Sequence, residues 1–85
     1  MAYTVNFSKK AEKAYQKLPG DVRRRVDQKL EYLRNTPRGP DTKKLQGYPN
    51  AYRTRVGDYR IIYEIEDAAL IVWILDVGGR GGIYK

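Results

Sequence analysis

The order of hydrophobic and polar residues changes its period along the chain, and each period predicts a type of element. Residues 3–7 alternate apolar with polar positions, which is the pattern of a half-buried strand. Residues 8–18 and 21–35 instead repeat apolar positions every three or four residues, as amphipathic helices do. We expect Ser8 and Asp21 to be the N-caps of these helices, which a Pro-Gly pair separates into a hairpin.

The second half of the chain has the pattern of strands joined by tight turns. Residues 38–50 contain glycine and proline with little periodicity and predict a connecting loop. Residues 52–56, 59–66 and 69–77 are rich in β-branched and aromatic residues and predict an antiparallel meander. The sequence therefore predicts one α+β domain over residues 1–85, ordered β-α-α-β-β-β, with the helices packed on one face of the sheet.

Charge and composition narrow the possible partners and chemistry. The chain has 17 Lys and Arg against 10 Asp and Glu, a net charge of +7 that attracts polyanions. It contains no cysteine and no histidine, which excludes Cys/His metal sites and the commonest acid/base side chain. We therefore expect no metal and no cofactor. No apolar run approaches membrane-spanning length, and the expected compartment is the cytoplasm.

The segment from residue 52 to residue 60 holds the first candidate site. If Gly57-Asp58 forms a two-residue hairpin turn, Arg55 faces Arg60 across the strands and Arg53 lies on the same side as Arg55. Opposed cations destabilise a sheet, so this arrangement favours a bound anion. A merely solvated basic face is the alternative interpretation.

Basic residues elsewhere extend the candidate surface. Arg80 lies between pairs of glycines that allow close approach to a phosphate, and Tyr84 follows as a stacking or hydrogen-bonding group. The alternative for this segment is a flexible tail. Lys10, Lys13 and Lys17 fall on one face of the first predicted helix, where they either contact a nucleic-acid backbone or are simply solvated.

Three segments together resemble the RelE/ParE toxin superfamily along nearly the whole chain. They are Lys-Leu-Gln-Gly at 44–47, Tyr-Arg-Thr-Arg at 52–55 continuing through Gly-Asp-Tyr-Arg-Ile-Ile-Tyr at 57–63, and Val-Gly-Gly-Arg at 77–80 with Ile-Tyr at 83–84. The chain is more similar to the RelE branch than to ParE-like gyrase inhibitors, because it has the arginine of the second meander strand, the arginine after the last strand and the terminal tyrosine.

The resemblance implies a fold, a reaction and roles for particular residues. In RelE-type toxins the 2′-hydroxyl of a messenger RNA attacks the adjacent phosphate within the ribosomal A site, and no cofactor takes part. Arg60 and Arg80 would stabilise the charged transition state, and Tyr84 would stack on the substrate base. Arg55 stands where some members have lysine; its guanidinium essentially cannot lose a proton, so it fits an electrostatic role and leaves the general base unidentified.

The resemblance also implies binding residues and partners. Arg53 and Lys44, together with the helical lysines named above, would bind RNA. The partners would be mRNA, the 30S A site of the ribosome and a cognate antitoxin encoded nearby. Two alternatives from other classes stay open: a ParE-like DNA gyrase inhibitor without catalysis, and an RNA-binding module that does not cut.

Overall fold

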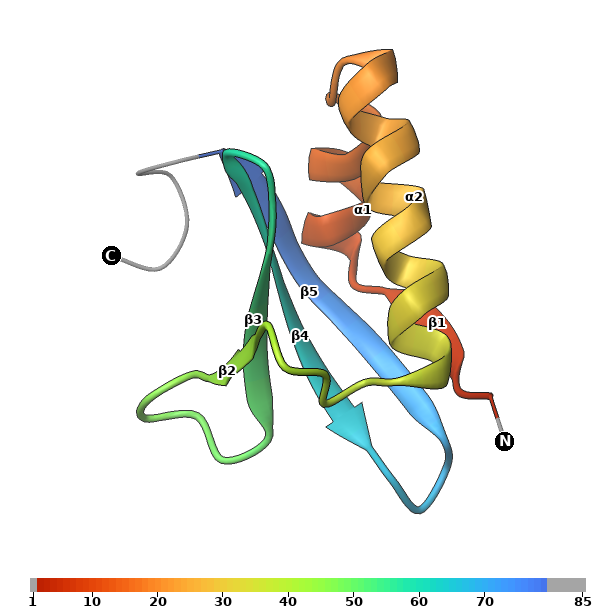
Figure 1. Ribbon diagram of the computed structural model, residues 1–85, viewed down its shortest axis with the longest axis vertical. Coiled ribbons are helices and arrows are strands. Elements are labelled where there is room, and N and C mark those ends of the chain that lie inside the picture. The colour runs from red at the N-terminus through yellow and green to blue at the C-terminus, as the bar shows by residue number, and fades with distance from the viewer. Residues whose placement is uncertain (1, 80–85) are drawn as a thin grey trace.

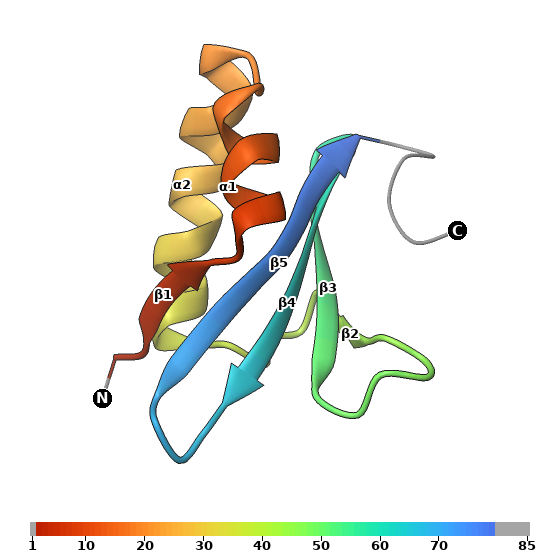
Figure 2. The ribbon, with the colours of Figure 1, turned by 180° about the vertical axis from the view of Figure 1, so that it is seen from behind.

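The computed structural model describes residues 2–79. In order along the chain its elements are β1 (Thr4–Phe7), α1 (Lys9–Gln16), α2 (Gly20–Asn35), β2 (Thr42–Lys44), β3 (Ala51–Val56), β4 (Tyr59–Glu66) and β5 (Ile71–Gly79). The strands form one sheet in the order β1-β5-β4-β3-β2. Both helices lie on the same side of β3, β4 and β5 (Figures 1 and 2), so the α+β fold predicted from the sequence is confirmed.

The sheet is mixed because its two edge strands differ from the meander. The strands β3, β4 and β5 pair antiparallel, as expected. The first strand, β1, pairs parallel with β5, and β2 adds an antiparallel edge strand to β3. The strand β2 lies within residues 38–50, which the sequence predicted to be a loop. The prediction missed it because a strand of three residues, two of them lysines, has no recognisable alternation of apolar and polar positions.

The two helices begin differently. The hydroxyl of Ser8 accepts a hydrogen bond from the backbone N–H of Ala11, which confirms the predicted N-cap of α1. The prediction for Asp21 is wrong: α2 begins at Gly20 with Pro19 as its N-cap, and no side chain caps it. Asp21 instead lies in the first turn, where its negative charge complements the helix dipole. Neither helix of the described residues is long and apolar enough to cross a membrane.

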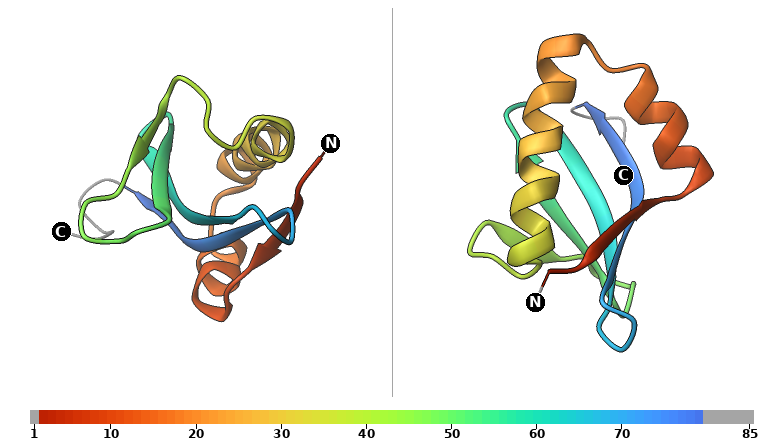
Figure 3. Two further views of the ribbon diagram at one scale, coloured as in Figure 1. Left: turned by 90° about the horizontal axis from the view of Figure 1, so that it is seen from below. Right: turned by 90° about the vertical axis from the view of Figure 1, so that its right-hand side faces the viewer.

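One face of the sheet carries the hydrophobic core. Four residues of α2 are buried in the core at helical spacing: Val22, Val26, Leu30 and Leu33. They share this cluster with alternate residues of the strands, among them Val56, Ile61, Tyr63, Val72, Ile74 and Val77. The right-hand view of Figure 3 shows α2 in front of β3 and β4, with α1 beside β5. Because successive side chains of a strand point to opposite faces, the residues of β3 and β4 that lie between these core positions are on the face of the sheet away from the helices.

A buried tyrosine, Tyr63, holds the connection between α2 and β3 against the sheet. The hydroxyl of Tyr63, a fully buried residue, donates to the carbonyl of Pro37 at 2.7 Å and lies 2.9 Å from the hydroxyl of Thr42. Burial raises the pKa of Tyr63 to about 12, so this hydroxyl keeps its proton at any physiological pH. The start of β2 is therefore fixed to β4 by a buried side chain.

A second set of contacts ties the same connection to the β4–β5 turn. The guanidinium of Arg38 donates to both carboxylate oxygens of Asp67, at 3.1 and 2.8 Å, and lies over the ring of Tyr52. The hydroxyl of Tyr3 donates to the same carboxylate at 2.7 Å. These donors, Arg38 first, lower the pKa of Asp67 to about 2.

Candidate nucleic-acid interface

The β3–β4 hairpin places two arginines directly opposite each other. Val56 pairs with Tyr59 and Arg55 pairs with Arg60, which is the register that the Gly-Asp turn predicts. Gly57 has a φ of +61°, a conformation that favours glycine, and a Cβ at this position would lie 2.7 Å from the guanidinium of Arg25. The turn therefore holds Arg55 and Arg60 side by side, with the first half of α2 close behind.

The edge strand β2 adds a further cation to this face. Lys43 pairs with Arg53 in the β2–β3 register, so both point to the same face as Arg55. A pocket of about 110 Å³ opens here, which we call the arginine pocket. It is lined by Asp41, Lys43, Arg53, Thr54, Arg55 and Arg60.

The cations of the arginine pocket have no acidic partner among the described residues. Within residues 2–79, no ion pair involves Lys43 or any of the three arginines. Asp41 is the only acidic residue lining the pocket in this part of the chain, and its carboxylate lies 2.6 Å from the Nζ of Lys29 on α2. The hydrogen bond from Lys29 lowers the pKa of Asp41 below its usual value. Four cations around a small opening are the arrangement expected of a site for an anionic group.

A second, wider groove of about 410 Å³ lies beside the arginine pocket, between α2 and the β3–β4 turn. Arg25, Lys29 and Tyr32 line it on the helix side. Arg55 lines both the groove and the arginine pocket, so the two form a continuous basic surface. The larger volume of the groove and its basic lining suit an extended polyanion rather than a single ion.

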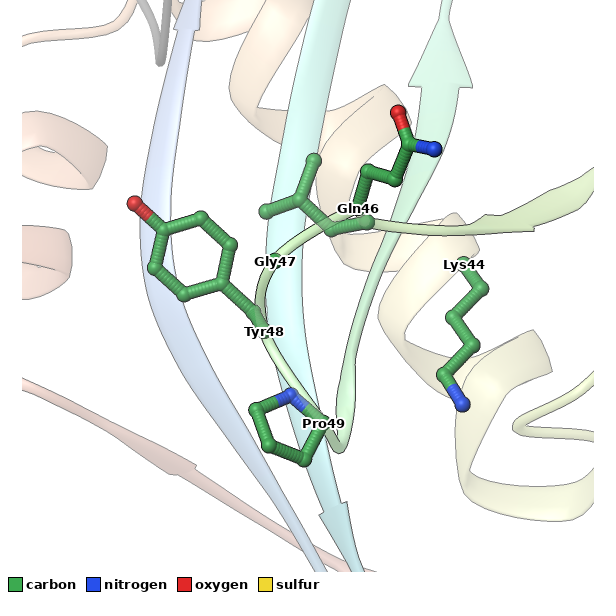
Figure 4. A pocket seen from close by; sticks show the side chains of 6 residues that line it. Lys44, Gln46, Gly47, Tyr48 and Pro49 are labelled. Carbon is green, nitrogen blue, oxygen red and sulfur yellow. The ribbon is translucent and has the colours of Figure 1, made fainter.

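Lys44 lies apart from the arginine pocket. It pairs with Tyr52, so its side chain leaves the sheet on the face opposite to that of Lys43 and Arg53. Lys44 instead lines a depression of about 380 Å³ along the loop from residue 44 to residue 49. Figure 4 shows Lys44 and Tyr48 extending from this loop in different directions.

The helical lysines belong to the β5 side of the molecule. The Nζ of Lys10 lies 3.2 Å from a carboxylate oxygen of Asp76, a residue of β5 that is 6% exposed. Lys13 lies in the last turn of α1, and Lys17 is its C-cap. The main contacts of α1 are with β5, whereas the arginine pocket lies towards β2. The structure therefore does not bring these lysines into the arginine pocket.

Two of the predicted site residues, Arg80 and Tyr84, lie outside the described residues. The described part of β5 ends with Gly78 opposite Arg60 and Gly79 opposite Tyr59. The last two described residues therefore lie beside the arginine pocket.

Asp41 and Lys43 line the pocket but are not among the residues that the sequence singled out. A strand over residues 42–44 would have identified Lys43, because alternation then separates it from Thr42 and Lys44. Nothing in the local sequence distinguishes Asp41, whose place in the pocket depends on the path of the loop before β2.

Comparisons with known proteins agree with this architecture. A family model described as the ParE toxin of the type II toxin-antitoxin system parDE matches residues 5–84. The mRNA interferase toxin RelE of Escherichia coli K12 is 33% identical over 82 residues, which cover 94% of this chain and 85% of that protein.

Two solved complexes show the same fold. In the archaeal RelE–RelB complex from Pyrococcus horikoshii OT3, the similar chain has a TM-score of 0.82 at 34% identity, covering 96% of this chain and 99% of that one. In the intact Escherichia coli RelBE toxin-antitoxin complex the TM-score is 0.83 at 31% identity, with 92% and 96% covered. The protein is therefore a toxin of the RelE/ParE family of type II toxin-antitoxin systems.

Proposed function

We propose that this toxin is a ribosome-dependent endoribonuclease that binds the ribosomal A site in the cytoplasm and cuts mRNA there by attack of a 2′-hydroxyl on the adjacent phosphate. The observation that carries the proposal is the arginine pocket, where four cations without acidic partners in the described chain surround one small opening. Phosphodiester cleavage develops negative charge on the phosphate oxygens, and fixed cations stabilise that charge. The relative from Escherichia coli is itself named an mRNA interferase toxin.

The proposed roles follow the chemistry of each side chain. Arg60 and Arg80 stabilise the charged transition state at the scissile phosphate, and Arg80 also assists the leaving 5′-oxygen. Arg55 adds positive charge beside them. Tyr84 stacks on the substrate base and orients it. Arg53 contacts the neighbouring backbone.

The lysines outside the pocket add affinity without chemistry. Lys44 on its loop, together with Lys10, Lys13 and Lys17 around α1, is proposed to contact RNA phosphates of the ribosome or messenger. Such contacts strengthen binding and make it depend on salt.

The test is cleavage of mRNA on programmed ribosomes with purified toxin. We expect new 5′ ends within the codon in the A site, and none when the ribosomes are omitted. Arg80→Ala should abolish the cut while leaving ribosome binding nearly intact, because contacts made only in the transition state do not contribute to ground-state affinity. Binding without any cleavage by the unmodified toxin would refute the proposal.

A gyrase inhibitor is the second candidate, because the matching family model is that of ParE toxins. A supercoiling assay with DNA gyrase separates the two functions. Inhibition of supercoiling, with mRNA left intact on ribosomes, would replace the proposed function by this one.

We also propose that an antitoxin protein covers the basic face of this toxin. Both similar structures described above are complexes, one of RelE with RelB and the other a RelBE toxin-antitoxin complex. An acidic segment of such a partner would complement the unpaired cations of the arginine pocket. Added antitoxin should then suppress cleavage in proportion to the toxin that it binds.

A further inference from the structure

The reaction proposed above needs a group that takes a proton from the attacking 2′-hydroxyl, and the arginines of the pocket cannot supply it. A guanidinium stays protonated in a protein, so Arg53, Arg55 and Arg60 can stabilise charge but cannot act as a base. The chain has no histidine. From Asp41, which lines the same pocket, we infer that its carboxylate is the general base that activates the 2′-hydroxyl. This inference rests on the proposed function.

The position of Asp41 suits this role. The residue directly precedes β2, and its side chain is 52% exposed, so a substrate can reach the carboxylate. Asp41 lines the same pocket of about 110 Å³ as the arginines, so a phosphate held there would lie near this residue, and the 2′-hydroxyl belongs to the ribose attached to that phosphate. An ionised carboxylate can accept about four hydrogen bonds, and Lys29 uses only one of its oxygens at 2.6 Å.

Lys29 has a positioning role in this arrangement. Its side chain is 19% exposed and comes from α2, so it fixes the carboxylate to a rigid element. It also keeps Asp41 ionised, because its hydrogen bond lowers the pKa of the carboxyl. A bound phosphate brings negative charge to the pocket and acts in the opposite direction, raising the pKa of Asp41 towards the range in which a base is effective.

The chemical step balances without any further reactant. The proton of the 2′-hydroxyl moves to a carboxylate oxygen of Asp41 while a bond forms between O2′ and phosphorus. The bond between phosphorus and O5′ breaks, and O5′ takes a proton from water. The products are a 2′,3′-cyclic phosphate and a 5′-hydroxyl end, and Asp41 then returns its proton to solvent.

The decisive experiment measures the rate of a single round of cleavage on programmed ribosomes, at saturating toxin and over a range of pH. Asp41→Asn should slow cleavage about 10²-fold or more, the usual contribution of a general base, with ribosome binding retained. Asp41→Glu should recover part of the rate. The matched control is Glu64→Gln, which removes the same charge at an exposed position towards the other end of β4 and should cleave like the unmodified toxin.

Lys29→Gln separates catalysis from structure. If Asp41 serves only to hold the loop through its ion pair, breaking that pair from either side should give the same loss. If Asp41 is the base, Lys29→Gln should still cleave far faster than Asp41→Asn, and the acidic limb of its pH profile should move to higher pH, because the cation that lowers the pKa of Asp41 is gone.

The outcomes distinguish this inference from the proposed function. Absence of cleavage by the unmodified toxin would refute the function itself. Cleavage by the unmodified toxin together with an equal rate for Asp41→Asn would refute the inference alone. An equal loss in Lys29→Gln and Asp41→Asn would also overturn the assignment of Asp41 as the base. Lys43 lines the same pocket, so a loss in Lys43→Gln with none in Asp41→Asn would transfer the role to that lysine.

Discussion

Arg55 and Arg60 are a residue pair whose arrangement suits the proposed function better than it suits the stability of the free toxin. They pair directly across β3 and β4 and have no ion pair within residues 2–79. Like charges directly opposite each other destabilise a sheet, typically by up to ~1 kcal/mol. An anion bound between them would remove that repulsion, so the free toxin is less stable than its fold allows.

Arg60→Leu should therefore stabilise the free toxin while destroying its activity. The substitution keeps bulk and removes one of the two opposed cations, so we expect a gain of a few tenths to ~1 kcal/mol at low salt. A change of ~1 kcal/mol corresponds to roughly 4–8 °C in melting temperature for a small domain. Cleavage should fall by orders of magnitude. Thermal unfolding at two salt concentrations, alongside the ribosome assay, measures both effects.

The control for this prediction is Arg24→Leu, which removes one exposed cation from α2 and leaves both Arg55 and Arg60 in place. If the gain comes from local repulsion, Arg24→Leu should not reproduce it, and added salt should reduce the gain of Arg60→Leu. A lower melting temperature for Arg60→Leu at low salt would show that Arg60 contributes to the fold instead.

Asp67 gives a prediction about pH at the same scale. Its pKa of about 2 in the folded protein lies below the ordinary value of 3.8. A depressed pKa contributes stability that is present above the unfolded value and is lost as the pH falls towards the folded one. The unmodified toxin should therefore melt higher than Asp67→Asn at neutral pH, and the difference should shrink between about pH 4 and pH 2. A difference that is constant with pH would contradict the contact with Arg38.

Among the elements, those with a clear local sequence pattern were predicted well, whereas those defined by contacts with distant residues were not. The spacing of Val22, Val26 and Leu30 predicted α2, and the Gly-Asp turn predicted the register of β3 and β4. The strand β2 was missed because pairing with β3 and the bond from Thr42 to Tyr63 define it, not its own sequence. The candidate site divides in the same way: the arginines follow from alternation, whereas Asp41 depends on the path of a loop.

Removal of the Tyr63 hydroxyl tests how β2 is held. Tyr63→Phe keeps the buried ring and leaves the carbonyl of Pro37 without its donor, so we expect a loss of about 1–3 kcal/mol. The backbone amides of β2 should exchange with solvent faster than those of β4. Tyr59→Phe is the control, since the ring of Tyr59 is only partly buried against the core. Equal effects of the two substitutions would show that the contact with Pro37 does not anchor the strand.

At the scale of the whole molecule, charge is distributed unevenly along the described part of the sheet, as β4 shows. Arg60 lies at the end of β4 next to the hairpin turn, whereas Glu64 and Glu66 lie towards its other end. The β4–β5 turn adds Asp67, already paired with Arg38. A polyanion is therefore attracted to one end of the sheet, and this would orient the toxin as it approaches the proposed RNA target.

The lysines of α1 should affect binding of the whole molecule rather than its chemistry. Replacing Lys13 and Lys17 with glutamine should weaken ribosome binding and flatten its dependence on salt, since fewer counterions are released. The rate of cleavage at saturating toxin should stay unchanged. Lys10→Gln is the comparison, because part of that charge already interacts with Asp76 and its loss should change the salt dependence less. Binding titrations at several salt concentrations supply the measurement.

The parallel pairing of β1 with β5 has a consequence for how the toxin is made. Thr4 pairs with Ile71, so the first strand to be synthesised waits for a partner far along the chain. Contacts of such separation form late and slowly in folding. During synthesis β1 stays without its partner until β5 has left the ribosome. A toxin proposed to act on translation thus acquires its complete sheet only after its last strand has emerged from the ribosome that makes it.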